Sequence, residues 1–181
     1  QMAAQAFVMG PTVENFEKNI AKYCQVKHAI GMSSGTDALL CALMAYDIGP
    51  GDEVIVPTFT FFATAGVVSR LGATPVFADI DPLTYNISPD SLADKITDDT
   101  KAIIPVHLYG QMAPMAEIMD IARKYELKVI EDACQSIGAS SQIYHATLTT
   151  QVDIQLHNIV AGIGICSKIT SRVTRIRSVN V

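Results

Sequence analysis

The chain has 181 residues, of which 49% are hydrophobic, and it carries a formal net charge of −5. That length suits one domain or a piece of a larger protein, and the acidic balance argues against a nucleic-acid partner. There is no run of 18 apolar residues, so neither a transmembrane helix nor a membrane partner is expected.

The four cysteines stand far apart, at positions 24, 41, 134 and 166, and form no C-x-x-C pair. This spacing argues against a disulfide framework or a metal site, and it predicts free thiols in a reducing, cytoplasmic compartment. The first residues lack the pattern of a signal peptide and an initiating Met, which suggests a truncated start.

Helices and strands are predicted to alternate along residues 1–140. Pro11 opens the first helix, and a Gly-Pro-Gly-Asp turn occupies positions 49–52. Ser88 and Pro89 start a short helix as its cap and first residue. The other predicted helices cover 36–46, 61–71 and 114–125, and the predicted strands cover 27–32, 53–57, 75–80, 102–107 and 128–133.

The strands are almost continuous apolar runs, as expected when both faces of a sheet are covered. The sequence therefore predicts an α/β domain with a doubly wound, mostly parallel sheet over residues 1–140.

Residues 141–181 differ from the rest. They carry 4 basic and 1 acidic residue, against 9 basic and 17 acidic in residues 1–140, and 17 of the 41 are Val, Ile or Thr. The boundary near 140 admits a second module, a strand-rich extension or sequence from outside the same gene product. A nucleotide-binding loop at Gly162-Ile163-Gly164 is disfavoured, because no acidic residue follows about 20 positions on.

Several strand ends carry residues suited to a ligand. Ser33-Ser34-Gly35-Thr36-Asp37 opens a helix, either as an ordinary N-cap or as a cradle for phosphate. Three aromatic residues, Phe59, Phe61 and Phe62, follow the next strand. One ring could lie against a cofactor, and at least two are expected in the core.

The last two strands end in polar residues. His107, Tyr109 and Gln111 follow the strand predicted over 102–107; His107 is expected to be buried, and Tyr109 is the better site candidate. Asp132 ends the next strand, where it either caps a helix, joins a surface salt bridge or pairs with a cationic ring. A flat, phosphorylated, cationic aromatic ring such as pyridoxal phosphate fits the combined set of groups.

Six motifs occur in order: FVMGP (7–11), SGTDAL (34–39), GPGDEVI (49–55), TFFAT (60–64), PVHLYGQ (105–111) and EDACQ (131–135). Together they resemble the DegT/DnrJ/EryC1/StrS family over about residues 7–139. The resemblance implies a fold-type-I aminotransferase that uses pyridoxal 5'-phosphate. Its substrates would be a nucleotide-linked keto sugar and glutamate as amino donor, and the complete enzyme would be a homodimer.

By that resemblance, Gly35 and Thr36 bind the cofactor phosphate and Phe61 stacks on the pyridine ring. Asp132 pairs with the pyridinium nitrogen, and Gln135 lies near the phenolic oxygen of the ring. Tyr109 lies nearby as a candidate substrate residue.

The family's Schiff-base lysine follows a serine, and the only Ser-Lys pair here is Ser167-Lys168. Lys168 lies farther from Asp132 than the family places its lysine, and its flanking residues differ. The small C-terminal domain of the family is not recognisable, so a fragment or a frameshifted product is expected. The alternative function is a non-catalytic protein that keeps the large-domain fold without the lysine.

Overall fold

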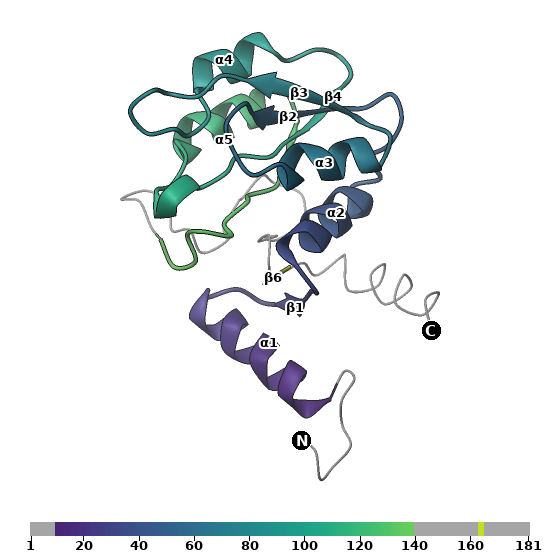
Figure 1. Cartoon of the computed structure of the whole chain (residues 1–181), viewed down its shortest axis with the longest axis vertical. Coiled ribbons are helices and arrows are strands. Elements are labelled where there is room, and N and C mark those ends of the chain that lie inside the picture. Colours follow the sequence, from purple (N-terminus) through teal and green to yellow (C-terminus); the bar gives the residue numbers. More distant parts are fainter. Residues whose placement is uncertain (1–9, 140–162, 165–181) are drawn as a thin grey trace.

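The computed structural model of the protein describes residues 10–139 and 163–164. Helices and strands alternate along this part of the chain (Figure 1). The helices are α1 (Pro11–Tyr23), α2 (Gly35–Ala45), α3 (Ala63–Arg70), α4 (Pro89–Asp94), the short 3-10 helix η2 (Leu108–Gly110) and α5 (Met115–Lys124). The strands are β1 (Ile30–Gly31), β2 (Glu53–Pro57), β3 (Thr74–Ala78), β4 (Thr100–Ile103), β5 (Lys128–Val129) and β6 (Ile163–Gly164).

Four strands form one parallel sheet in the order β3-β2-β4-β5. The central strand β2 pairs on one side with β3, in a register that matches Ile55 with Val76. On its other side it pairs with β4, where Ile55 faces Ile103 after a register shift near Glu53. Because each parallel neighbour requires a crossover connection, helices cover the sheet on both sides.

Two hydrophobic cores confirm this doubly wound architecture. Successive residues of a strand point to opposite faces, so Val54 and Val56 enter one core while Ile55 enters the other. The first core lies under α2 and α3, and the second lies under α4 and α5. Their fully buried helix residues are Leu39, Ala42, Leu43, Val67 and Val68 in the first, and Leu92, Ile118, Met119 and Ala122 in the second.

Local sequence signals set several helix starts. α1 begins at Pro11, and α4 begins at Pro89 with the Ser88 hydroxyl accepting a hydrogen bond from the Ser91 N–H, 3.4 Å away. Both helices were predicted from a proline in the first turn, where the missing N–H costs no hydrogen bond.

The strands are shorter than predicted. β4 ends at Ile103, before Pro105, which has no N–H to donate to a ladder. β5 ends at Val129. Its alignment with the preceding strand continues through the Ile130 N–H, which donates to the Ile103 carbonyl at 2.9 Å, and through an isolated bridge between Val106 and Asp132.

The strand predicted over 27–32 is the largest difference. Only Ile30–Gly31 is extended as β1, and it pairs antiparallel with β6 rather than joining the parallel sheet. The expectation of one continuous sheet was therefore wrong for this strand. Its backbone pairs with residues 163–164, which lie beyond the boundary predicted near residue 140.

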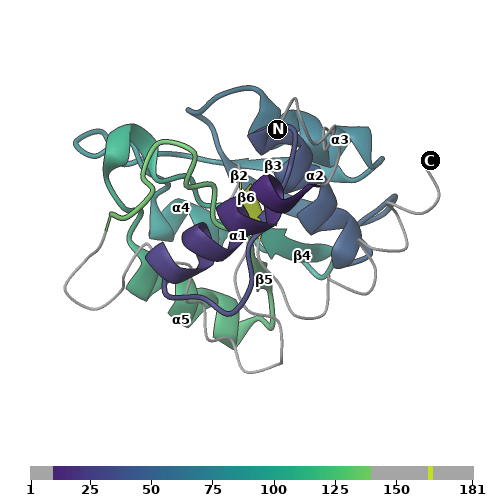
Figure 2. The same cartoon turned by 90° about the horizontal axis from the view of Figure 1, so that it is seen from below.

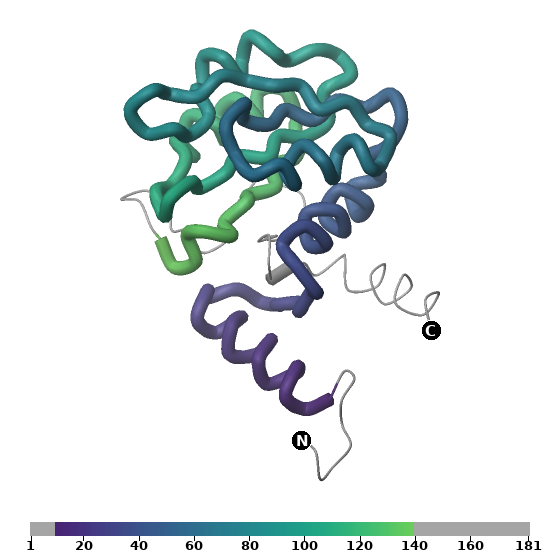
Figure 3. Tube along the Cα trace, in the orientation of Figure 1, coloured from purple at the N-terminus to yellow at the C-terminus, as the bar shows by residue number. Residues whose placement is uncertain are grey.

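Helix α1 lies below the sheet and crosses it in the view from beneath (Figure 2). The segment that follows β5 lies between the sheet and α1 (Figure 3). Ile20 of α1 packs on a small cluster formed by Cys24 and Ala133. A Glu17 carboxylate oxygen also accepts a hydrogen bond of 2.7 Å from the Gly31 N–H. These contacts fix α1 beside the edge of the sheet at which the strands end.

None of the helices in the described part of the chain has both the length and the apolar character to cross a bilayer.

Candidate functional site

Asp132 lies at the carboxyl end of the parallel sheet, and its main chain is fixed on both sides. The Asp132 N–H donates to the Pro105 carbonyl at 2.9 Å, and the His107 N–H donates to the Asp132 carbonyl at 3.0 Å. Pro105 has no N–H group to donate, but its carbonyl still accepts a hydrogen bond. The two bonds hold Asp132 at the carboxyl end of the strands, where open α/β sheets bind ligands.

The Asp132 side chain is buried, with 7% of the residue exposed. One carboxylate oxygen accepts a hydrogen bond from the Thr64 hydroxyl at 3.2 Å, and the other accepts from the Cys134 N–H at 3.3 Å. Among residues 10–139, no Lys, Arg or His forms an ion pair with this carboxylate. No helix begins directly after it either, so within this range Asp132 is neither a helix cap nor part of a salt bridge.

A buried carboxylate with two hydrogen bonds but no cation is an incomplete arrangement, because burial of an unpaired charge is costly. The Asp132 carboxylate therefore fits a cationic ligand that can donate a hydrogen bond from an N–H group. A pyridinium ring meets both conditions.

Thr64 was missed by sequence reasoning. Thr64 is the second residue of α3 and is fully buried. Its hydroxyl donates a hydrogen bond to Asp132, which lies 68 positions later in the chain. A threonine inside a helix gives no local signal for such a contact. The available signal was its place as the last residue of the TFFAT motif (60–64), which follows β2.

The N-terminus of α2 is capped by Ser34, as one of the two predictions for this segment has it. The Ser34 hydroxyl caps the helix by accepting from the Asp37 N–H at 3.1 Å. Hydrogen bonds from the Ser33 and Ser34 hydroxyls hold the pKa of Asp37 below its ordinary value. The cap leaves the N–H groups of Gly35 and Thr36 without a hydrogen-bond acceptor among the described residues. Two such N–H groups at the positive end of a helix suit a phosphate group.

The three aromatic residues after β2 are all exposed, so the expectation that at least two would be core residues was wrong. Phe61 and Phe62 are 75% and 81% exposed, and Phe59 is half-exposed with its ring 5.7 Å from that of Tyr85. They lie in the bend between β2 and α3, outside both cores. Phe61 belongs to the first turn at α3, where its carbonyl accepts from the Thr64 N–H at 3.2 Å.

A hydrogen bond joins the main chain of Tyr109 to the side chain of Gln135. The Tyr109 N–H donates to the Gln135 side-chain oxygen at 2.8 Å, which leaves the Gln135 amide NH₂ without an acceptor in the described region. Tyr109 has a positive φ of 56° and a side chain directed outward, with 71% of the residue exposed. The two residues thus lie together, and Gln135 follows Asp132 by three positions.

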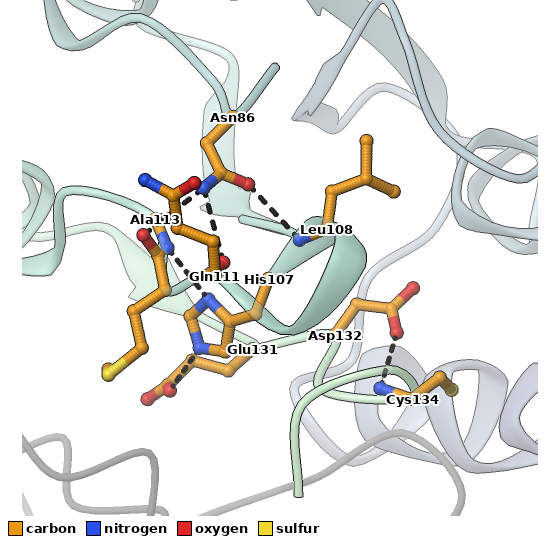
Figure 4. A network of polar contacts seen from close by, with 9 residues as sticks. Asn86, His107, Leu108, Gln111, Ala113, Glu131, Asp132 and Cys134 are labelled. Atoms are coloured by element: carbon orange, nitrogen blue, oxygen red, sulfur yellow. Dashed lines mark hydrogen bonds and ion pairs between the residues drawn. The ribbon is translucent and has the colours of Figure 1, made fainter. Parts of the chain in front are cut away.

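His107 is fully buried, as expected, and belongs to a polar network behind Asp132 (Figure 4). Its Nδ1 accepts from the Ala113 N–H at 3.1 Å, so the proton of the neutral ring is on Nε2. That Nε2–H donates to the Glu131 carboxylate at 2.9 Å. The network also contains Asn86, which sequence reasoning missed because its partners are 22 to 26 positions away.

Cys134 lies beside Asp132 and shares its loop. Partial burial, followed by the Asp132 charge and a hydrogen bond to it, raises the pKa of the Cys134 thiol to about 12. The thiol is therefore protonated at neutral pH and is a poor nucleophile.

Hydrogen bonds thus connect Asp132 with Thr64, and Thr64 with the Phe61 carbonyl. A separate hydrogen bond connects Tyr109 with Gln135, three residues after Asp132. No hydrogen bond links the start of α2 to this group within the described range. Lys168, the candidate Schiff-base residue, lies outside the described residues.

Comparison with known proteins gives a family match. The model of the DegT/DnrJ/EryC1/StrS aminotransferase family matches residues 1–148. The chain is 55% identical over 138 residues to a pleiotropic regulatory protein of Geobacillus stearothermophilus, covering 76% of this chain and 37% of that protein. It is 53% identical over 134 residues to the UDP-2-acetamido-2-deoxy-3-oxo-D-glucuronate aminotransferase of Pseudomonas aeruginosa, covering 74% and 37%.

The 3-oxo-glucose-6-phosphate:glutamate aminotransferase of Bacillus subtilis is 44% identical over 162 residues, covering 90% of this chain and 36% of the enzyme. The chain therefore spans about a third of the length of these curated relatives.

Solved structures share the fold. The S. venezuelae protein DesV, in complex with a ketimine intermediate, superposes with a TM-score of 0.85 at 32% identity, covering 97% of this chain and 50% of that one. The Bacillus subtilis protein ntda, with bound cofactor PMP, has a TM-score of 0.74 at 47% identity, covering 76% of this chain and 32% of the other.

Proposed function

The chain belongs to the DegT/DnrJ/EryC1/StrS aminotransferase family, and on that premise we propose that it forms the cofactor-binding part of a pyridoxal-phosphate-dependent sugar aminotransferase. The reaction would move an amino group from glutamate to the ketone of a nucleotide-linked sugar. The names of the P. aeruginosa and B. subtilis relatives support this reaction type. The observation that carries the proposal is the buried Asp132 carboxylate, which has hydrogen-bond donors but no cation in the described structure.

In this proposal each residue of the site binds a different part of the cofactor. The N–H groups of Gly35 and Thr36 bind the phosphate, and Phe61 covers one face of the ring. Gln135 uses its free NH₂ group toward the phenolic oxygen. When bound, pyridoxal phosphate supplies a ring that withdraws electrons from the reacting carbon.

Asp132 has the decisive electrostatic role, because its carboxylate would hold a proton on the ring nitrogen. Thr64 and the Cys134 N–H fix the direction of the carboxylate from both oxygens. Burial keeps water from weakening the charge interaction. Tyr109 is proposed to lie on the substrate side of the ring, because its side chain projects outward from the same loop cluster.

The complete enzyme is proposed to be a cytoplasmic homodimer. The exposed rings of Phe59, Phe61, Phe62 and Tyr109 at one end of the sheet support a partner surface there. Cys24 is a free thiol, which fits the reducing compartment expected from the sequence.

Pyridoxamine 5'-phosphate provides a direct test, because it binds without a covalent bond to lysine. We expect the chain to bind it, and Asp132→Asn to weaken binding about 10- to 150-fold, the effect of losing one charged hydrogen bond of about 1.5–3 kcal/mol. Equilibrium titration followed by cofactor fluorescence measures both affinities. Asp81→Asn, at a partly exposed carboxylate in the β3–α4 connection, is the control. Equal affinities for the original chain and the Asp132 variant would exclude the proposed role of Asp132.

A non-catalytic protein with the same fold is the second candidate, and the positions of the lysines favour it. Lys18 and Lys101 interact with Glu14 and Asp98, whereas Lys124 and Lys128 lie over tyrosine rings. No lysine of the described residues contacts Asp132, which leaves Lys168 as the candidate for the covalent bond.

Pyridoxal 5'-phosphate separates the two functions. If Lys168 forms the covalent bond, the absorption band of a protonated Schiff base appears on mixing and is lost in Lys168→Ala. Lys95→Ala, at the C-terminal cap of α4, is the matched control and should keep the band. Binding of pyridoxamine phosphate without any Lys168-dependent band would establish the non-catalytic alternative.

A further inference from the structure

Asn86 lies in the connection between β3 and α4, and only 2% of it is exposed. Its side chain makes three hydrogen bonds, all to the main chain of the segment 108–112 (Figure 4). Its oxygen accepts from the Leu108 N–H at 3.1 Å, and its nitrogen donates to the carbonyls of Gln111 at 3.2 Å and Met112 at 3.1 Å. We propose that Asn86 is a positioning residue that holds this segment so that Tyr109 is presented to the ligand.

The segment needs such support because its backbone is strained. Tyr109 and Gly110 are consecutive residues with positive φ values of 56° and 85°. A non-glycine residue in this region is disfavoured and persists only where its surroundings fix it. Inside the segment, one bond from the Gln111 N–H to the Leu108 carbonyl closes the turn. Asn86 binds the chain on both sides of that turn.

The chemistry of asparagine matches this task. One acceptor faces an N–H group, and two donors face two carbonyl groups. The reversed amide would place like groups against each other, so the hydrogen-bond pattern assigns the orientation. The main-chain carbonyl of Asn86 accepts a hydrogen bond from the Asp81 N–H at 2.9 Å. This bond anchors Asn86 in its own loop.

Two further contacts connect this segment with the Asp132 loop. The His107 ring accepts from the Ala113 N–H and donates to Glu131, the neighbour of Asp132. On the other side of the turn, the Tyr109 N–H reaches Gln135. The Tyr109 side chain itself is 71% exposed, so its position follows from the backbone that Asn86 holds.

The discriminating variant is Asn86→Asp, which keeps the size and the acceptor but sets a carboxylate oxygen against two carbonyls. Hydrogen exchange of single amides, measured by NMR on the full chain without ligand, gives the readout. The Tyr109 amide should exchange about 30-fold faster, the factor expected for two hydrogen bonds of typical net strength. The Ile104 amide, bonded to the Ile55 carbonyl in the sheet, should be unchanged.

Asp52→Ala is the matched control. It removes the acceptor for the Gly49 N–H in a separate turn, without touching the loop of Asn86 or residues 108–112. Its Tyr109 amide should exchange as in the original chain. An unchanged Tyr109 amide in Asn86→Asp, or equal acceleration at Tyr109 and Ile104, would overturn the proposal, since the second result marks a role in global stability alone.

A second measurement rests on the proposed function. If Asn86 acts through Tyr109, Asn86→Asp should weaken pyridoxamine phosphate binding in the original chain and have no further effect in Tyr109→Ala. Additive effects would refute the action through Tyr109. Failure of the original chain to bind the ligand would reject the proposed function, while the exchange measurement would still decide the role of Asn86.

Discussion

At the scale of single residues, Asp132 and Cys134 form an electrostatic pair that can be measured without any ligand. Burial is the largest cause of the raised thiol pKa of about 12, and the Asp132 carboxylate adds to it through its charge and a hydrogen bond. A negative charge disfavours the thiolate, so the ionisation of Cys134 reports on the charge of Asp132.

We therefore predict that Asp132→Asn accelerates alkylation of Cys134 at pH 8. Removal of the charge lowers the pKa of the thiol, and each unit raises the thiolate fraction about tenfold. Burial remains, so the pKa should stay above its ordinary value. Peptide mass spectrometry after iodoacetamide treatment distinguishes Cys134 from the other cysteines. Asp81→Asn should leave the alkylation rate unchanged. If Asp132→Asn also leaves the rate unchanged, the charge of Asp132 does not control the ionisation of Cys134.

At the scale of elements, α1 depends on a close approach to the segment after β5. Gly138 has a φ of +80°, and a Cβ atom there would lie 2.5 Å from the Tyr23 hydroxyl at the end of α1. Glycine at this position therefore serves both the backbone conformation and the contact between the two elements.

Gly138→Ala should destabilise the fold more than Gly51→Ala does. Gly51 also has a positive φ, of +95°, but a Cβ atom there meets nothing within 4 Å. We expect about 1–2 kcal/mol for Gly51→Ala from backbone strain alone and about 1 kcal/mol more for Gly138→Ala from displacement of Tyr23. Urea unfolding measures both values. In a Tyr23→Ala background the excess should disappear, and an excess that persists would show that Tyr23 is not its cause.

At the scale of the whole molecule, signals local in sequence were predictable. Pro11, Pro89 and the Ser88 cap start helices as expected, and the apolar strands gave the parallel, doubly wound sheet. What escaped prediction depends on distant partners. Thr64 and Asn86 look ordinary in their own segments because their hydrogen-bond partners lie far along the chain.

The aromatic residues after β2 show the opposite limit. Their composition suggested core residues, yet Phe61 and Phe62 are exposed, because they lie in the bend that leaves the sheet before α3 begins. Sequence motifs indicated which residues gather near Asp132. They did not reveal the hydrogen bonds that orient its carboxylate, since these depend on α3 and on the loop after β5.

The strand order β3-β2-β4-β5 determines the order in which strands can pair while the chain is being synthesised. The chain leaves the ribosome from its N-terminus, yet the central strand β2 must wait for Thr100 and its neighbours before both its sides are paired. β5 is added later still, when Lys128 and Val129 align with Ala102 and Ile103. Asp132 follows β5, so among the strands that the structure describes in the parallel sheet, the buried carboxylate comes after the last to be synthesised. During synthesis, the helix end that suits phosphate is present long before the charge that suits the ring.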